Sequence, residues 1–73
     1  MNYLERMKQL RRECNYTQEY IADYLGVEAK MYVDMESGKE EVFVDDTVKL
    51  ARMYDVDMNY MCGVSDEKNE FPK

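Results

Sequence analysis

The chain has 73 residues, of which 45% are hydrophobic and 36% are charged, with three glycines and one proline. A chain of this length forms one small domain at most, which excludes a two-domain enzyme, a doubly wound nucleotide-binding fold and any barrel. Ten basic residues against sixteen acidic ones give a net charge of −6, and an acidic chain argues against nucleic acids and membrane surfaces as partners.

The first part of the sequence predicts two helices. One face of the first helix carries Leu4, Met7, Leu10 and Cys14, at spacings of three, three and four residues, while Arg6 falls on another face.

Thr17 is a suitable N-cap for the second helix, and Gly26 is a suitable turn residue at its end. The buried face of this short helix consists of Ile21, Ala22 and Leu25.

A third helix is predicted from about Glu28 to the stop signal Ser37-Gly38, with Tyr32 and Met35 facing inward. Residues 39–44 have no periodicity and are predicted to form a loop.

The last part of the sequence predicts two more helices. Asp45 is a suitable cap for a fourth helix, and Asp57 for a fifth that ends at Gly63. The inward positions are Val48, Leu50 and Ala51 in the fourth helix, and Met58, Met61 and Cys62 in the fifth. No segment alternates with a period of two, so the sequence predicts no sheet. Residues 64–73 are polar, and we expect a loose tail after a domain of residues 1–63.

The composition offers little for catalysis or metal binding. There is no histidine, the commonest general base and metal ligand. Asp55, Asp57, Asn59 and Asp66 have the spacing of a calcium loop, but Tyr60 stands where that loop needs glycine. We therefore predict no enzyme, no cofactor and no metal. Cys14 and Cys62 are predicted to be reduced thiols of a cytoplasmic protein, although the sequence leaves a single disulfide open. No apolar run approaches the roughly 20 residues of a membrane span.

The spacing within about residues 17–36 is the most informative feature. Two helices joined by a short turn that contains a glycine, here Gly26, form a helix-turn-helix. The second helix of this motif can lie in the major groove of DNA.

Several segments together resemble the lambda-repressor-like, Cro-type family of transcriptional regulators, also called xenobiotic-response-element regulators. They are residues 7–11 (MKQLR), 16–22 (YTQEYIA), 25–27 (LGV), 36–39 (ESGK), 48–51 (VKLA) and 56–63 (VDMNYMCG). The resemblance implies an all-α, compact bundle of five helices. It also implies an ion pair between Arg11 and Glu36, which would tie the first helix to the third.

The resemblance further implies a prokaryotic or phage repressor that binds operator DNA, as a homodimer on a two-fold symmetric site. Its DNA contacts carry over to Gln18 at the start of the second helix, and to the helix of residues 28–36 and the residues that follow it: Glu28, Ala29, Lys30, Val33, Asp34, Ser37 and Lys39.

The charge of the same region supports an alternative. Residues 16–48 hold two basic residues against nine acidic ones, a net charge of −7. Tyr20 and Tyr24 lie one turn apart on the solvent face of the second helix, where the family usually has charged residues. Tyrosine is enriched at protein interfaces. The chain is therefore either a DNA-binding regulator or a helix-turn-helix module that binds a basic protein through its second and third helices, as an antirepressor, an antitoxin-like partner or a scaffold.

Overall fold

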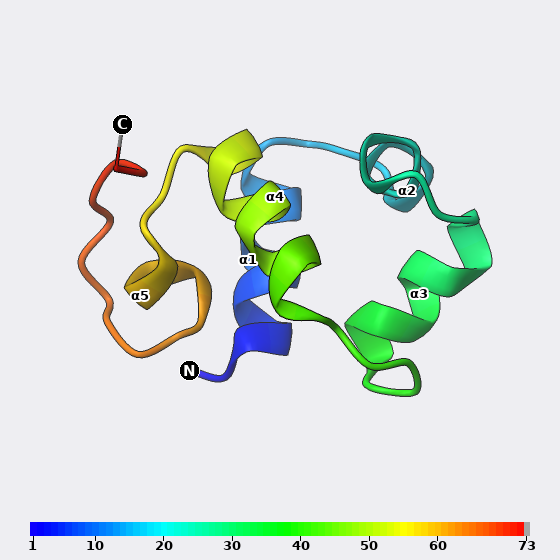
Figure 1. The fold of residues 1–73 in the computed structure, drawn as a ribbon, viewed down its shortest axis with the longest axis horizontal. Helices are drawn as coiled ribbons and strands as arrows, with labels where there is room; N and C mark the ends of the chain where they lie inside the picture. Colours follow the sequence, from blue (N-terminus) through cyan, green and yellow to red (C-terminus); the bar gives the residue numbers. More distant parts are fainter. Residues whose placement is uncertain (73) are drawn as a thin grey trace.

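Residues 1–72 are described by the structure, a computed structural model, and within that range it has five helices and no strand. They are α1 (Tyr3–Glu13), α2 (Gln18–Leu25), α3 (Ala29–Ser37), α4 (Val44–Tyr54) and α5 (Met58–Met61). The predicted all-α, five-helix architecture is confirmed. Figure 1 shows α1 and α4 at the centre of the bundle, α2 and α3 at one end of its long axis, and α5 with the C-terminal segment at the other end.

Short polar side chains fix three of the helix starts. Asn2, Thr17 and Asp57 each accept a hydrogen bond from the backbone N–H three residues ahead, at 2.8, 3.0 and 2.9 Å. The predicted cap of the fourth helix is wrong. Phe43 is the N-cap of α4, and Asp45 lies in its first turn, where a carboxylate also suits the helix dipole.

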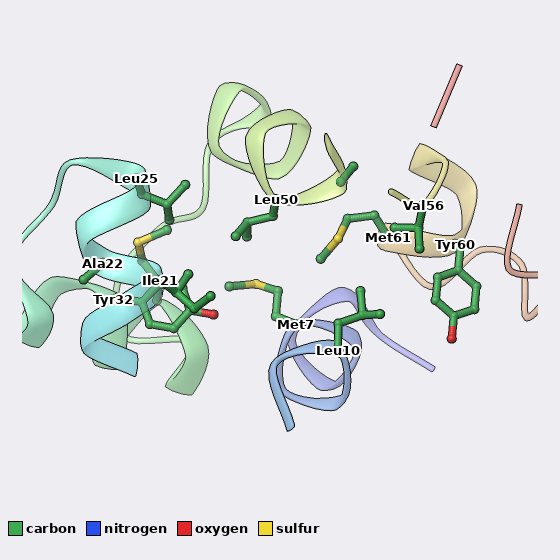
Figure 2. Packing of buried hydrophobic residues seen from close by; sticks show 12 residues of the cluster. Met7, Leu10, Ile21, Ala22, Leu25, Tyr32, Leu50, Val56, Tyr60 and Met61 are labelled. Carbon is green, nitrogen blue, oxygen red and sulfur yellow. The ribbon is translucent and has the colours of Figure 1, made fainter. Parts of the chain in front are cut away.

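The core fills the space between the central and terminal helices (Figure 2). It consists of Met7, Leu10, Ile21, Ala22, Leu25, Tyr32, Met35, Leu50, Ala51, Val56, Tyr60 and Met61. Most predicted inward positions are therefore buried, but Cys14 and Cys62 are exposed free thiols. Each follows the last residue of its helix as the C-cap. Both positions therefore lie beyond the helical residues whose side chains pack on the core.

Arg6 is buried, contrary to the sequence prediction. Only 2% of it is exposed, and its guanidinium carbon lies 3.7 Å from the centre of the Tyr60 ring. One terminal nitrogen donates to Asp66 Oδ1 at 3.0 Å. The aromatic face and the carboxylate together compensate for the burial of this charge.

The C-terminal segment is irregular but not loose. Phe71 packs against the core, and Lys68 pairs with Glu13 of α1 at 3.0 Å. The backbone of Asp57 donates to the carbonyl of Asn69 at 2.8 Å. Residues 64–72 therefore lie along α1 and α5. The boundary at residue 63 stays a prediction, and Lys73 lies outside the described residues.

Within residues 1–72, none of the helices combines the length and the apolar character needed to cross a membrane. The same part of the chain contains no group of three or more His, Cys, Asp or Glu side chains that could hold a metal ion. Two of the residues that have the spacing of a calcium loop make other contacts, since Asp57 caps α5 and Asp66 pairs with Arg6.

Candidate nucleic-acid interface

Helices α2 and α3 meet through a turn of residues 26–28. Gly26 adopts a left-handed conformation with φ of 76°, which is favourable only for a residue without a Cβ atom or with a short polar side chain. The N–H of Val27 donates to the Ala22 carbonyl at 3.0 Å and closes the end of α2. The turn leaves α3 at the outer edge of the bundle (Figure 1). One face of α3 packs on the core, and the residues of the opposite face are exposed.

An ion pair anchors α3 to α1. Arg11 Nε and Nη2 donate to the two carboxylate oxygens of Glu36 at 2.7 and 3.2 Å, and Arg11 Nη1 donates to the Tyr16 carbonyl at 3.1 Å. Gln18, the first residue of α2, donates its amide to Glu36 Oε1 at 3.1 Å. Glu36 therefore connects three helices.

The surroundings of Glu36 favour its charged form. Burial raises the pKa of this carboxyl, but the hydrogen bonds from Arg11 and Gln18 and the charge of Arg11 outweigh burial, so the pKa lies below its ordinary value. The Arg11 guanidinium has a raised pKa, chiefly because of its hydrogen bond to Glu36. Both members of the pair are ionised near neutral pH.

The free face of α3 is mixed in character. Glu28, the N-cap, is exposed and makes no side-chain cap bond. Lys30 and Val33 are exposed, whereas Ala29 is half-buried against the core. Met31 is also exposed on this helix, and the sequence prediction did not include it among the contacts. The helical period places it outside the inward positions Tyr32 and Met35.

Lys30 forms an ion pair with Asp34, one turn later on α3. Lys30 Nζ lies 2.9 Å from Asp34 Oδ2, with the lysine side chain 84% exposed and the aspartate side chain 22% exposed. The hydrogen bond to Asp34 and its negative charge raise the pKa of Lys30.

The C-terminal end of α3 is a tight turn. Ser37 Oγ donates to the Asp34 carbonyl at 3.0 Å, and the N–H of Lys39 donates to the same oxygen at 2.9 Å. Gly38 holds a left-handed conformation with φ of 87°. The side chain of Lys39 is exposed just beyond this turn.

The two tyrosines of the alternative prediction are held by contacts within the chain. The Tyr20 ring stacks on Tyr16 with 4.6 Å between ring centres, and the Tyr24 hydroxyl donates to the Lys49 carbonyl at 3.3 Å. Both rings remain about half exposed. The hydroxyl of Tyr24 thus connects α2 to α4, whereas Tyr20 stacks on a residue just before its own helix.

An apolar groove with a volume of about 250 Å³ lies among the starts of α1, α4 and α5. Its lining residues carry no charge: Tyr3, Val42, Val44, Thr47, Met58 and Cys62. Phe43 and Val44 expose 60% and 72% of their surface beside it. The sequence prediction missed this groove, because its residues come from three separate segments.

Comparison with known proteins identifies the bundle. The helix-turn-helix family model matches residues 7–61. The uncharacterized HTH-type transcriptional regulator YobD of Bacillus subtilis is 34% identical over 65 residues, which cover 89% of this chain and 58% of that protein.

Two further relatives have similar coverage. HTH-type transcriptional regulator AnsR of Bacillus subtilis is 29% identical over 70 residues, or 96% of this chain and 60% of AnsR. The cryptic phage CTXphi transcriptional repressor RstR of Vibrio cholerae is 31% identical over 72 residues, or 96% of this chain and 64% of RstR. The chain thus spans about three fifths of the length of these relatives. No solved structure matches the chain significantly.

Proposed function

This chain belongs to the helix-turn-helix family, whose model covers residues 7–61, and we propose that it is a sequence-specific, DNA-binding transcriptional regulator of the cytoplasm. In this proposal α3 enters the major groove of an operator, and binding blocks access to the promoter. The observation that carries the proposal is the intact helix-turn-helix, with α3 anchored from behind by Arg11 and Glu36 at 2.7 Å and free on its outer face. The relatives, which are named transcriptional regulators or a repressor, support it.

The side chains of α3 suit base edges. Lys30 can donate to guanine, and the carboxylate of Glu28 can accept from the amino group of cytosine. Ala29 and Val33 can contact thymine methyl groups. These four residues would supply the sequence preference, because they line one side of the helix and its N-cap.

Apart from Asp34, which pairs with Lys30, the remaining predicted contacts concern the phosphate backbone. Lys39 and the hydroxyl of Ser37 lie at the end of α3 and would meet phosphates there. Gln18 donates one hydrogen of its amide to Glu36, and the second would contact phosphate or help to orient a base-reading side chain.

The charge of the interface implies weak, salt-sensitive binding. Residues 16–48 carry a net charge of −7, with Lys30 and Lys39 as their only bases. With Lys30 on a base edge, one copy of the chain would then neutralise roughly one to three phosphates through Lys39 with help from Lys8 or Arg12. We expect the logarithm of the binding constant to fall with the logarithm of salt at a slope of about −1 to −3 per copy.

We also propose that the regulator binds as a homodimer on a two-fold symmetric operator. The apolar groove supports a contact between copies, because its six lining residues are uncharged in a chain of net charge −6. Two such chains repel one another least where they meet through uncharged side chains. Val44 in the lining and its neighbour Phe43 are both largely exposed, so two copies that meet here would cover apolar surface.

Selection from random duplex DNA with the purified protein at about 50 mM salt, which spares weak phosphate contacts, tests the function. We expect enrichment of a short, two-fold symmetric motif. On the selected site, Lys30→Ala should lower affinity by roughly 5- to 150-fold, as for the loss of one base contact. Tyr20→Ala and Tyr24→Ala are matched controls on α2 and should have little effect. If folded protein enriches no motif and captures basic proteins through Tyr20 or Tyr24, the protein-binding alternative replaces DNA recognition.

A further inference from the structure

The Lys30–Asp34 ion pair changes how α3 can contact DNA. Lys30 is the only basic residue between Glu13 and Lys39. In the free protein its ammonium lies 2.9 Å from Asp34 Oδ2. The free face of α3 therefore presents its one positive charge already paired with a carboxylate.

This pairing penalises contact with phosphate. Lys30 has donors left for a phosphate while it is paired, but the Asp34 carboxylate would then lie close to the phosphate, and two negative charges would share one ammonium. If Lys30 left Asp34, the unpaired carboxylate would still lie close to the negatively charged DNA backbone. The carboxylate of Asp34 cannot move far from this position, because the side chain is largely covered. The backbone of Asp34 is also held, since its carbonyl accepts the N–H of Lys39 at 2.9 Å. An exposed lysine without such a partner would incur no penalty of this kind.

A G·C base pair in the major groove removes the conflict. An ammonium has three donors, so Lys30 can keep Asp34 and still donate to the acceptors of guanine. The carboxylate of Asp34 has lone pairs left and can accept from the amino group of cytosine. Guanine and cytosine of one pair present these acceptors and this donor side by side, as the ion pair presents its donor and acceptor.

We propose that Lys30 and Asp34 read one G·C base pair as a unit, and that Asp34 determines specificity by holding Lys30 away from phosphates. The inference rests on the proposed function, since it concerns the DNA contacts of the same helix. It assigns the aspartate a positive role in recognition, whereas the overall charge of the region suggests only repulsion.

The test compares the wild-type protein with Asp34→Asn and with the matched control Asp23→Asn. Both variants remove one negative charge, but Asp23 lies on α2, is exposed, and forms no ion pair with any of residues 1–72. Each protein undergoes selection from random duplexes, and its affinity for a duplex without the selected motif is measured by fluorescence anisotropy over a range of salt. Thermal unfolding checks that Asp34→Asn remains folded.

We expect the wild-type motif to contain a G·C pair whose preference falls about tenfold in Asp34→Asn, the value of one good base contact. The salt slope for the non-selected duplex should steepen by about 0.9 in this variant, because Lys30 becomes free to neutralise a phosphate. Asp23→Asn should change neither quantity.

Two results would overturn the inference, and they separate it from the proposed function. If the wild type enriches a motif but Asp34→Asn matches Asp23→Asn in both its G·C preference and its salt slope, Lys30 and Asp34 do not read a base pair as a unit. The proposed DNA recognition then still stands. If the folded wild-type protein enriches no motif and binds no duplex at about 50 mM salt, both are wrong.

Discussion

A single carboxylate, that of Glu36, joins the end of α1, the start of α2 and the end of α3. Its two oxygens accept from Arg11 at 2.7 and 3.2 Å and from Gln18 at 3.1 Å. Because Glu36 is only 3% exposed, removal of its charge would leave the Arg11 guanidinium with little compensation. Breaking a buried pair from one side costs about 3 kcal/mol or more. The orientation of α3 therefore depends on the ionisation of Glu36.

This dependence predicts how stability varies with pH. The pKa of Glu36 in the folded protein is lower than its ordinary value of 4.5, so the unfolded chain binds a proton first as pH falls. The stabilisation is complete above 4.5 and is lost as pH falls through the lower, folded pKa. Glu36→Gln should be about 3 kcal/mol less stable than wild type at pH 7, with the difference shrinking below about pH 4.

Urea unfolding between pH 7 and pH 3 checks this expectation. Glu13→Gln is the control, because Glu13 also has a lowered pKa, from its bonds to Gln9 and Lys68, but lies at the surface. Its effect should be small because solvent screens the charges. A stability difference between Glu36→Gln and wild type that stayed constant down to pH 3 would contradict the assignment.

Residues differ in how far the sequence reveals them. The family resemblance indicates the partnership of Arg11 with Glu36, and the structure has the two side chains in contact. The tie between Gln18 and Glu36 was not predicted, because it depends on where three helix ends meet. The burial of Arg6 was not predicted either, since helical periodicity reports a residue's face but not the Tyr60 ring that covers it.

Elements are more predictable than single contacts, because their signals are local. Thr17 and Asp57 cap their helices through hydrogen bonds to the third residue ahead, a spacing visible in the sequence. The start of α4 was misassigned because Asp45 suits either a cap or a first turn. The position of Phe43 at the cap depends on the loop before it, which has no periodic pattern.

Two turns that look alike in sequence should respond differently to substitution. Gly26 and Gly63 both follow a helix and both have positive φ, at 76° and 79°. A Cβ atom at Gly26 would meet nothing within 4 Å, whereas one at Gly63 would overlap the carbonyl oxygen of Met1. Gly26→Ala should cost about 1 kcal/mol for the left-handed backbone alone.

Gly63→Ala should cost at least about 2 kcal/mol, because the backbone before α1 must also move away. Urea unfolding of both variants at neutral pH measures the difference. Equal decreases in the free energy of unfolding would show that the N-terminal backbone moves at little energetic cost. Its contact with Gly63 would then contribute little to the position of α1.

For the whole molecule, the sequence predicted the number and order of helices but not the surfaces between them. The C-terminal segment shows why. Its polar composition suggested a loose tail, yet Phe71, Lys68 and Asp66 each contact a residue far away in the sequence. Polar composition measures how little apolar area a segment can bury, but it says nothing about ion pairs to helices formed elsewhere in the chain.

The apolar groove is a second surface that only the folded chain reveals, and the proposed homodimer predicts its behaviour. Val44 lines the groove and is 72% exposed in the single chain. Val44→Asp would bury an unpaired carboxylate between two copies. It should weaken self-association at least about tenfold, a penalty of about 1.4 kcal/mol. Val33→Asp adds the same charge to an exposed position on α3, away from the groove, and should leave self-association unchanged.

Sedimentation equilibrium without DNA measures both variants, and the two exposed thiols give an independent check. Cys62 lines the groove, whereas Cys14 ends α1 and does not. A short bismaleimide should therefore link two copies of the Cys14→Ser variant but not of Cys62→Ser. Efficient linkage through Cys14 alone would move the interface to another face. A wild-type protein that remained monomeric at all concentrations measured would contradict the proposed contact between copies through the groove.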